Sequence, residues 1–309
     1  MRVLVTGGAG FIGGHLVDAL LAQGATVRVI DNFSTGRRSN IEHNLSRIEL
    51  IEGDLRDEET CARAVKDIEL IYHEAAIPSV ARSVEDPVSS NEVNVGGTVK
   101  LLNAARKAGV KRVVYAASSS AYGETEVLPK VETMTPAPVS PYAISKLAGE
   151  QYLTTFGRLY GMKTCSLRYF NVFGPRQDPK SHYAAVIPKF VTSLLAGEAP
   201  MIFGDGEQTR DFCFIENVVS ANMLAGKADV NGEVVNVACG DRVSLNQLVE
   251  LINVEIGTRI PPKHAEPRPG DIRHSLADIR AAQKLLGYEA KFDLRAGLKK
   301  TIDYYRSQR

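Results

Sequence analysis

A glycine-rich turn near the N-terminus constrains the fold of this chain more than any other feature. Residues 2–6 form a short apolar, β-branched run typical of a buried parallel strand, and residues 11–22 carry apolar side chains at helical spacing. Between them, Gly7, Gly10 and Gly13 allow a tight turn, close approach of backbone to a phosphate, and packing of the helix on the strand. The N–H groups at the start of the helix would face the phosphates. The pattern predicts a strand–turn–helix unit that binds a dinucleotide.

The next strand supports this interpretation. Residues 26–30 form a second apolar run that ends in Asp31, roughly twenty residues after the glycines, where a ribose-binding acid belongs. Its carboxylate would accept hydrogen bonds from ribose hydroxyls and repel a 2′-phosphate, which favours NAD over NADP. Arg37 and Arg38 are the counter-argument, because arginines just past this strand can bind a phosphate. We interpret them as part of a solvated loop.

Strands and helices alternate through the first half of the chain. Further strands are expected at 48–51, 70–73, 113–116, 164–168 and 234–237, and further helices at 58–66, 88–108 and 142–160. This alternation predicts an α/β fold, a doubly wound parallel sheet of the Rossmann type with a smaller, interleaved α/β substrate-binding lobe. We expect the dinucleotide-binding domain at 1–171 plus about 211–238, and the lobe at about 172–210 and 239–309.

Composition narrows the functional class. The chain has 309 residues, 44% of them hydrophobic and 24% charged, and its formal net charge is +1. This balance argues against nucleic acid or an acidic membrane surface as partner, and no apolar run is long enough to span a bilayer. The chain begins directly with a core strand, so no signal peptide is expected. Four scattered cysteines without metal-ligand spacing predict reduced thiols, a cytoplasmic location and no metal site.

Three polar residues further along predict alcohol chemistry. Pro141 can open a helix, which would place Tyr142 and Lys146 on one face, four residues apart. A free tyrosine has a pKa of about 10, and a neighbouring ammonium and a nicotinamide cation would both lower it. Ser118 follows the strand at 113–116 and could hold a substrate hydroxyl. Taken alone, Tyr142 and Lys146 would be interpreted as two residues of an exposed helix, and Ser118 as part of a serine-rich loop. The dinucleotide-binding turn favours a catalytic role for all three.

Ordered motifs along the whole chain resemble those of a known family. The chain resembles the extended branch of the short-chain dehydrogenase/reductases, and within it the UDP-hexose 4-epimerases. The matching segments are Gly7-x2-Gly10-x2-Gly13, His73-Glu74-Ala75-Ala76, Asn94-Val95-x-Gly97-Thr98, Ser118-x3-Tyr122-Gly123, Ser140-Pro141-Tyr142-x3-Lys146, Arg168-Tyr169-Phe170-Asn171, Gly174-Pro175-Arg176-Gln177, Arg210-Asp211-Phe212 and Arg268-Pro269-Gly270-Asp271. Related dehydratases carry an Asp-Glu pair where this chain has Ser119 and Ser120, so dehydration is not expected.

The resemblance implies a reaction and a set of site residues. Tyr142 would take the proton of the sugar 4-hydroxyl while hydride passes to NAD, and the 4-keto sugar would turn over before the hydride returns. Lys146 would lower the pKa of Tyr142 and Ser118 would orient O4. The expected NAD-binding residues are Gly7, Gly10, Phe11, Ile12, Gly13, Asp31, Asn32, Ser34, Gly36, Asp54, Leu55, Ala75, Ala76, Asn94, Tyr142, Lys146 and Phe170. The expected UDP-sugar-binding residues are Ser79, Ser118, Ser119, Asn171, Gln177, Ala185, Val186, Arg210, Arg268, Asp271 and Ser275.

One position bears on the substrate. By resemblance, the residue at 275 lines the sugar pocket, and a tyrosine there would fill the space that a 2-acetamido group needs. Ser275 leaves that space open, which favours interconversion of UDP-GlcNAc and UDP-GalNAc, with UDP-glucose and UDP-galactose as a second pair. Three alternatives stay open: a preference for the non-acetylated pair, a UDP-glucuronate epimerase or decarboxylase using Arg82 or Lys189, and a non-catalytic nucleotide-sugar or NAD sensor. The resemblance also implies a homodimer.

Overall fold

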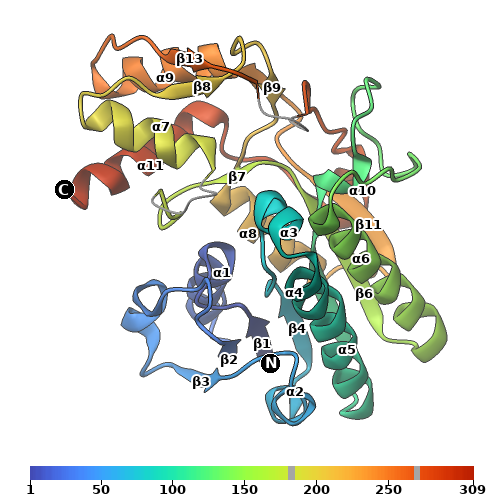
Figure 1. Ribbon diagram of the computed structural model, residues 1–309. Coiled ribbons are helices and arrows are strands. Elements are labelled where there is room, and N and C mark those ends of the chain that lie inside the picture. The colour runs from blue at the N-terminus through green and yellow to red at the C-terminus, as the bar shows by residue number, and fades with distance from the viewer. Residues whose placement is uncertain (180–184, 268–271) are drawn as a thin grey trace.

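A seven-stranded sheet forms the centre of the molecule (Figure 1). The computed structural model describes residues 1–179, 185–267 and 272–309. All neighbouring strands of the sheet run parallel. In spatial order the strands are β11 (Glu233–Val237), β6 (Lys163–Tyr169), β5 (Arg112–Ser118), β4 (Leu70–His73), β1 (Arg2–Thr6), β2 (Thr26–Asp31) and β3 (Ile48–Glu52). Every strand expected from the sequence is present, and the predicted doubly wound fold is confirmed.

Helices cover both faces of the sheet. Because side chains alternate along a strand, Val3 and Val5 of β1 pack in one hydrophobic core while Leu4 packs in the other. The first core holds α1 (Phe11–Ala22) and α8 (Ile215–Ala225) against the sheet, and the second holds α2 (Glu58–Val65), α5 (Thr98–Lys107) and α6 (Pro141–Tyr160). The two layers of helices thus fix both faces of the sheet and leave its carboxyl edge for a ligand.

The helix expected at 88–108 is wrong as a single α-helix. The structure has α4 (Pro87–Asn91), a π-helical segment at Glu92–Gly97, and then α5, with the short helix α3 (Val80–Glu85) before them. The wider turn brings the Asn94 amide to the backbone of Ile77, which donates to Asn94 Oδ1 at 2.8 Å. A π-turn inserts one residue into the helical repeat, and such turns often lie beside functional sites.

The remaining elements form the smaller lobe above the sheet in Figure 1. Three helices and a short parallel strand pair make up most of it: α7 (Val186–Leu195), α9 (Leu245–Ile256), α11 (Leu294–Ser307), β8 (Met201–Phe203) and β13 (Lys263–Ala265). Two strand pairs connect it to the sheet, β7 (Val172–Phe173) with β10 (Cys213–Phe214) and β9 (Thr209–Arg210) with β12 (Val243–Ser244). Helix α10 (Arg280–Leu286) contacts β11 and α8. The domain boundaries given above remain a prediction.

Two further observations concern the described residues as a whole. Within 1–179, 185–267 and 272–309, no helix is long and apolar enough to cross a membrane, and no group of three or more His, Cys, Asp or Glu is arranged to hold a metal ion. The cysteines are free thiols, and Cys61, Cys165 and Cys213 are buried.

Candidate active site

The turn between β1 and α1 is tight enough to require glycine. Gly7 has a φ of +67°, and a Cβ there would lie 2.8 Å from the backbone of Ala75. A Cβ on Gly13 would lie 2.2 Å from the carbonyl oxygen of Gly7. Gly10 precedes α1 and offers no side-chain cap. The first N–H groups of α1 therefore remain available to an anion, and the turn has the geometry of a phosphate cradle.

Asp31 lies at the carboxyl end of β2 and faces the same cavity. Its Oδ2 accepts a hydrogen bond from Ala9 N at 2.9 Å and its Oδ1 from Phe33 N at 2.8 Å. A Cβ on Gly36 would lie 2.9 Å from both carboxylate oxygens. Burial raises the pKa of Asp31, and the two backbone hydrogen bonds oppose this shift. The carboxylate is thus held rigidly where it can accept from a ribose.

The nearby Arg37 and Arg38 are exposed, as expected of a solvated loop, and each also has an acidic partner. Arg37 forms an ion pair with Asp178, and Arg38 Nη2 lies 3.0 Å from Glu52 Oε2. The Arg38 guanidinium also stacks over the ring of Phe33 at 5.0 Å. Both arginines are paired with a carboxylate, so a 2′-phosphate would have to compete with Asp178 or Glu52 for them.

A single cavity of about 940 Å³ runs along the carboxyl edge of the sheet. It brings together most of the residues that the sequence predicts for NAD and the sugar. The predicted residues that line it are Gly7, Gly10, Phe11, Ile12, Gly13, Asp31, Asn32, Ser34, Gly36, Asp54, Leu55, Ala75, Ala76, Ser79, Ser118, Ser119, Tyr142, Lys146, Phe170, Asn171, Gln177, Ala185, Arg210 and Ser275. Arg268 and Asp271 lie outside the described residues.

Two predicted residues do not line this cavity. Asn94 is buried, and its amide bonds to Ile77 and to Ser145 Oγ, the latter at 3.0 Å. It therefore supports the loop that carries Ala75 and Ala76 rather than facing the cavity. Val186 lines an adjoining pocket instead.

Ser118, Tyr142 and Lys146 come together at the centre of the cavity. Ser118 is the last residue of β5, and its hydroxyl accepts from Ser120 Oγ at 2.8 Å. Ser140 caps α6 by accepting from Ala143 N at 3.2 Å, and Pro141 opens the helix, so Tyr142 lies in its first turn. The Tyr142 and Ser118 side chains line the same part of the cavity, and hydrogen bonding by Ser118 acts to lower the pKa of Tyr142. The geometry places a phenol and a hydroxyl where one substrate oxygen could contact both.

The electrostatics of Tyr142 differ from the expectation. Burial raises its pKa above the ordinary value, and the hydrogen bond with Ser118 offsets part of that rise. Lys146 lies one turn further along α6, buried, with Nζ 4.7 Å over the ring of Tyr115. Burial lowers the pKa of Lys146, while the charge of Glu74 opposes that shift. In the protein alone, burial is the larger cause acting on the pKa of Tyr142, and the lowering cause is Ser118 rather than the predicted Lys146.

Sequence reasoning assigned no role to several residues of the cavity. Glu74 follows β4 and its carboxyl lies in the cavity beside Tyr169. Lys130 is buried, and its Nζ donates to Val127 O at 2.9 Å. His274 also lines the cavity, and so does Arg82, which the sequence suggested only for the UDP-glucuronate alternative. The sequence shows the motif that contains Glu74, but not the contact of Glu74 with Tyr169, because the two residues are far apart along the chain.

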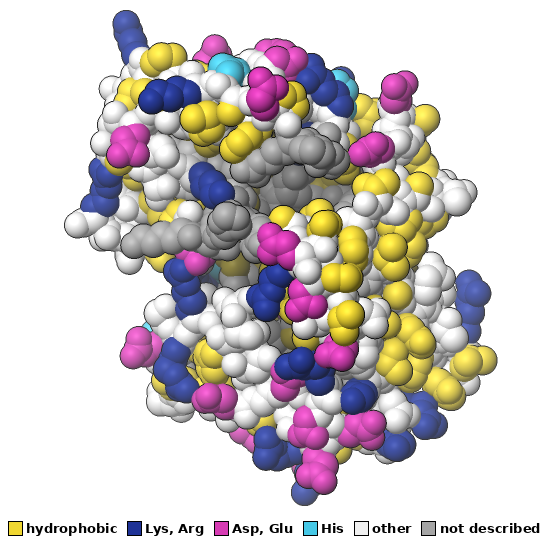
Figure 2. Space-filling model, viewed as in Figure 1, with side chains coloured by type: hydrophobic (Ala, Val, Ile, Leu, Met, Phe, Trp, Pro, Cys, Tyr) yellow, Lys and Arg dark blue, Asp and Glu magenta, His cyan; other side chains and the backbone are white. Residues whose placement is uncertain are grey.

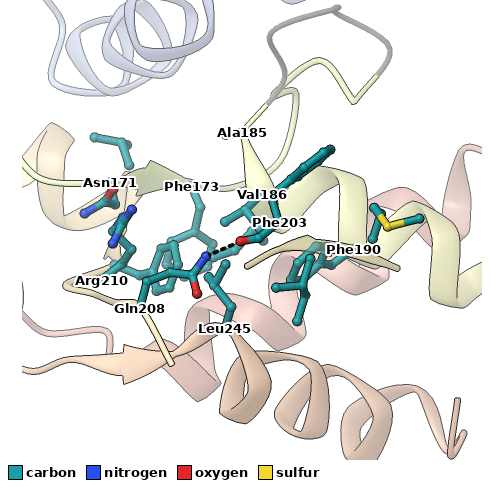
Figure 3. Close-up of a pocket in the computed structure, with 14 residues that line it drawn as sticks. Asn171, Phe173, Ala185, Val186, Phe190, Phe203, Gln208, Arg210 and Leu245 are labelled. Carbon is teal, nitrogen blue, oxygen red and sulfur yellow. Dashed lines mark hydrogen bonds between the residues drawn. The ribbon is translucent and has the colours of Figure 1, made fainter. Parts of the chain in front are cut away.

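An adjoining pocket of about 270 Å³ shares Asn171, Ala185 and Arg210 with the large cavity. Figure 3 shows aromatic and aliphatic side chains on most of its sides, with Asn171, Gln208 and Arg210 at one end. Gln208 Nε2 donates to Phe203 O at 2.7 Å. Asn171 has a φ of +26° and donates from Nδ2 to Asp211 O at 3.1 Å. The pocket can hold a flat apolar group, with a guanidinium at its junction with the large cavity.

Comparison with known proteins agrees with this geometry. The model of the NAD dependent epimerase/dehydratase family matches residues 3–238. The chain belongs to this NAD dependent epimerase/dehydratase family. It is 42% identical to a UDP-glucose 4-epimerase of Mycolicibacterium smegmatis, with 100% of this chain and 99% of that protein covered.

Two solved structures of epimerases are similar over the full chain. The UDP-glucose 4-epimerase of Thermotoga maritima with UDP-glucose has a TM-score of 0.96 and 42% identity, covering 100% of this chain and 99% of that one. A UDP-N-acetylglucosamine 4-epimerase of Methanobrevibacter ruminantium M1 in complex with UDP-N-acetylmuramic acid has a TM-score of 0.96 and 41% identity, with the same coverage. The predicted membership of the UDP-hexose 4-epimerases is confirmed, and so is the NAD cofactor expected for this epimerase family.

Proposed function

We propose that this epimerase interconverts UDP-GlcNAc and UDP-GalNAc, with UDP-glucose and UDP-galactose as a second pair. The meeting of Ser118, Tyr142 and Lys146 in one cavity, with Tyr142 and Lys146 on one helix face, carries the assignment of a reaction at a hydroxyl. Similarity to 4-epimerases of both UDP-glucose and UDP-N-acetylglucosamine supports position 4 as the reacting carbon.

The residues present fit NAD. The turn at Gly7, Gly10 and Gly13 leaves room for a pyrophosphate that side chains would fill, and Asp31 is placed for a ribose. Asn32 and Asp54 line the same end, where Asn32 Nδ2 donates to Asp54 Oδ2 at 2.8 Å. When bound, NAD supplies reversible acceptance of a hydride from the sugar carbon.

The side chains of the protein remove and return the proton of the sugar 4-hydroxyl. Ser118 holds the sugar hydroxyl, and Tyr142 takes its proton as the carbon loses hydride. Since burial raises the pKa of Tyr142, the positive charges of Lys146 and of a bound nicotinamide together stabilise the phenolate. The 4-keto sugar then presents its other face, and Tyr142 returns the proton to O4. One carbon is inverted and no cofactor is consumed.

The substrate must be held by its nucleotide so that the sugar can turn. The pocket lined by Phe173, Ala185, Val186 and Phe203 suits a pyrimidine ring. Arg210 lies between that pocket and the large cavity, where a guanidinium can bind a pyrophosphate. By resemblance, Asn171, Arg268 and Asp271 complete the UDP contacts.

Space near the sugar supports the acetylated pair. Ser275 lines the cavity, and its N donates to Thr209 O at 3.0 Å, which fixes it beside β9, the strand that carries Arg210. Gln177 Oε1 is buried without a hydrogen-bond partner among the described residues, so it can accept from a hydroxyl or an acetamido N–H. Ser79 and Ser119 offer further hydroxyls.

A substrate panel tests this function. Purified protein is incubated with UDP-GlcNAc, UDP-glucose and UDP-glucuronate without added cofactor, and the products are identified. We expect UDP-GalNAc as the main product and UDP-galactose as a slower one. No turnover of the acetylated pair would refute the preference, and activity confined to UDP-glucuronate would support the alternative that uses Arg82, which lines the cavity.

The Tyr142→Phe variant tests catalysis against a sensing role. It should lose epimerisation and still bind NAD, because the phenol hydroxyl is the proton acceptor. A near-normal rate would refute Tyr142 as the base.

We also propose a homodimer. Figure 2 shows hydrophobic side chains gathered on the side of the molecule formed by α5 and α6. Exposed apolar residues on and beside α6 include Val84, Val88, Ile144, Leu159 and Tyr160. Sedimentation should give twice the chain mass, and Ile144→Glu with Leu159→Glu should give a monomer.

A further inference from the structure

Asp211 is a fully buried carboxylate between β9 and β10 that the proposed reaction does not use. Its Oδ1 accepts a hydrogen bond from Cys239 N at 2.9 Å, and its Oδ2 accepts from Gly240 N at 3.1 Å and from Ala277 N at 3.2 Å. Two of these N–H groups directly follow β11, and the third lies much further along the chain. The carboxylate therefore joins segments that are distant in sequence.

The more distant of these segments is part of the cavity. Ala277 belongs to residues 273–278, which form the side of the cavity that carries Ser275 and are called the Ser275 wall below. Parallel bridges join this wall to Thr209 on one side and to Lys130 on the other. On the first side, Ser275 N donates to Thr209 O at 3.0 Å. The wall is thus paired like a short strand between two other segments.

The Asp211 carboxylate continues this pairing where β9 ends. Backbone N–H groups alternate in direction along an extended segment, so Ser275 N and Ala277 N point to the same side. Ser275 N finds the carbonyl of Thr209 there, and Ala277 N finds the side chain of Asp211. Ala277 is buried, and a buried N–H group without an acceptor is unfavourable. The position of the wall beyond Ser275 therefore depends on this carboxylate.

The backbone of Asp211 belongs to the other end of the substrate site. Asp211 directly follows Arg210, which lines both the large cavity and the adjoining pocket. Its carbonyl oxygen accepts from Asn171 Nδ2 at 3.1 Å, and Asn171 also lines both. One residue thus links the groups assigned to UDP, through its main chain, with the wall assigned to the sugar, through its side chain.

We propose that Asp211 is a positioning residue for substrate size: its carboxylate holds the Ser275 wall at a fixed place relative to Arg210, and so sets the room for the substituent at C2 of the sugar. This inference rests on the proposed function, which places the sugar beside Ser275. Asp211 acts through the wall and does not need to touch the substrate.

The Asp211→Asn variant keeps the size of the side chain and loosens the wall. It loses the charge that strengthens all three hydrogen bonds, and in either orientation its NH2 group faces a backbone N–H. The main-chain contact with Asn171 remains. We expect the Kd of UDP-GlcNAc to rise about fivefold and that of UDP-glucose to rise less. The Kd of UDP, which has no sugar, should stay within about twofold.

The experiment measures the Kd of UDP, UDP-glucose and UDP-GlcNAc by calorimetry on the NAD-loaded protein. Burial raises the pKa of Asp211 to about 6, so a buffer of about pH 8 keeps the carboxyl ionised. Thr209→Val is the second variant, because it removes only the contact of Thr209 Oγ1 with His274 Nδ1, at 2.9 Å, and keeps the backbone pairing of the wall. It should give the same pattern at smaller size.

Asn253→Asp is the matched control, an exchange of amide and carboxyl in the opposite direction. Asn253 is also buried and also holds backbone, since its Oδ1 accepts from Ile260 N at 3.0 Å, but it does not line the cavity. This variant should lower the melting temperature and leave the ratios of the three Kd values unchanged. The same selective loss of UDP-GlcNAc in Asn253→Asp would show that general destabilisation is the cause, and would overturn the proposal.

Two further results would also overturn it: Asp211→Asn weakens all three ligands equally, or it weakens none. Should Asp211→Asn not fold, Thr209→Val is judged by the same two criteria. Binding needs no turnover, so the test is separate from that of the proposed function. A wild-type protein that binds all three ligands but inverts neither sugar would refute the proposed function, while the pattern of Kd values would still decide the role of Asp211.

Discussion

Arg37 and Asp178 form an ion pair that joins the loop after β2 to the segment after β7. Asp178 lines the large cavity, and Arg37 directly follows Gly36, which also lines it. The pair thus connects the two walls between which a dinucleotide would lie.

Arg37→Ala should therefore release NAD faster. Both side chains are partly exposed, so the pair contributes at most about 1 kcal/mol, which corresponds to no more than about a fivefold faster release. Release is measured by assaying free NAD after dilution of the purified protein. High salt should shrink the difference, because it screens exposed charges.

Arg38→Ala is the matched control for that variant. Arg38 pairs with Glu52, which, unlike Asp178, does not line the cavity, so the loss of Arg38 should leave NAD release unchanged. Equal effects of the two variants would show that general loss of positive charge, rather than the link, matters.

Ser275→Tyr should discriminate between the two substrate pairs. The larger ring would occupy the space beside the sugar, so kcat/KM for UDP-GlcNAc should fall at least about tenfold more than that for UDP-glucose. Both values are measured on one preparation, so the second substrate is the internal control. Equal losses would mean that position 275 does not limit substrate size.

Ser118→Ala should both slow the reaction and displace its pH profile. The hydrogen bond from Ser118 lowers the pKa of Tyr142, so without it the phenol ionises at higher pH and the acidic limb of kcat moves upward. Ser120→Ala leaves that hydrogen bond in place and should move the limb less. If the pH profile of Ser118→Ala coincides with that of the wild type, Ser118 does not influence the pKa of Tyr142.

Gly13→Ala should destabilise the fold and weaken NAD binding together. The new Cβ would lie 2.2 Å from the Gly7 carbonyl oxygen, so the turn must open, at a cost of about 1–3 kcal/mol of unfolding free energy. Gly96→Ala is the control, since its Cβ would meet nothing closer than 4.0 Å. Thermal unfolding with and without added NAD measures both effects, and equal melting temperatures for the two variants would contradict the geometry.

The positions of the strands along the chain and the place of the site could be predicted from the sequence because both depend on local patterns. Apolar runs gave every strand of the sheet, and the residues after them, such as Gly7, Asp31 and Ser118, line one cavity because parallel strands end at a common edge. Tyr142 and Lys146 share a face through simple helical spacing.

Features that depend on contacts between distant segments could not be predicted. The π-turn around Asn94 follows from its hydrogen bonds to Ile77 and Ser145, which no helical period reveals. The partner of Arg37 lies far along the chain, so this ion pair could not be predicted from local pattern. Burial raises the pKa of Tyr142, and burial is a property of the folded chain that residue spacing does not reveal.

The fate of the hydrogen at C4 tests the central claim most directly. UDP-GlcNAc carrying deuterium at C4 is incubated with the purified enzyme in ordinary water without added cofactor, and the UDP-GalNAc formed is analysed by mass spectrometry and NMR. If hydride leaves and returns within one closed cavity, the product keeps its deuterium at C4 with that carbon inverted. Deuterium exchanged for solvent hydrogen, or a product not inverted at C4, would contradict the proposed redox cycle.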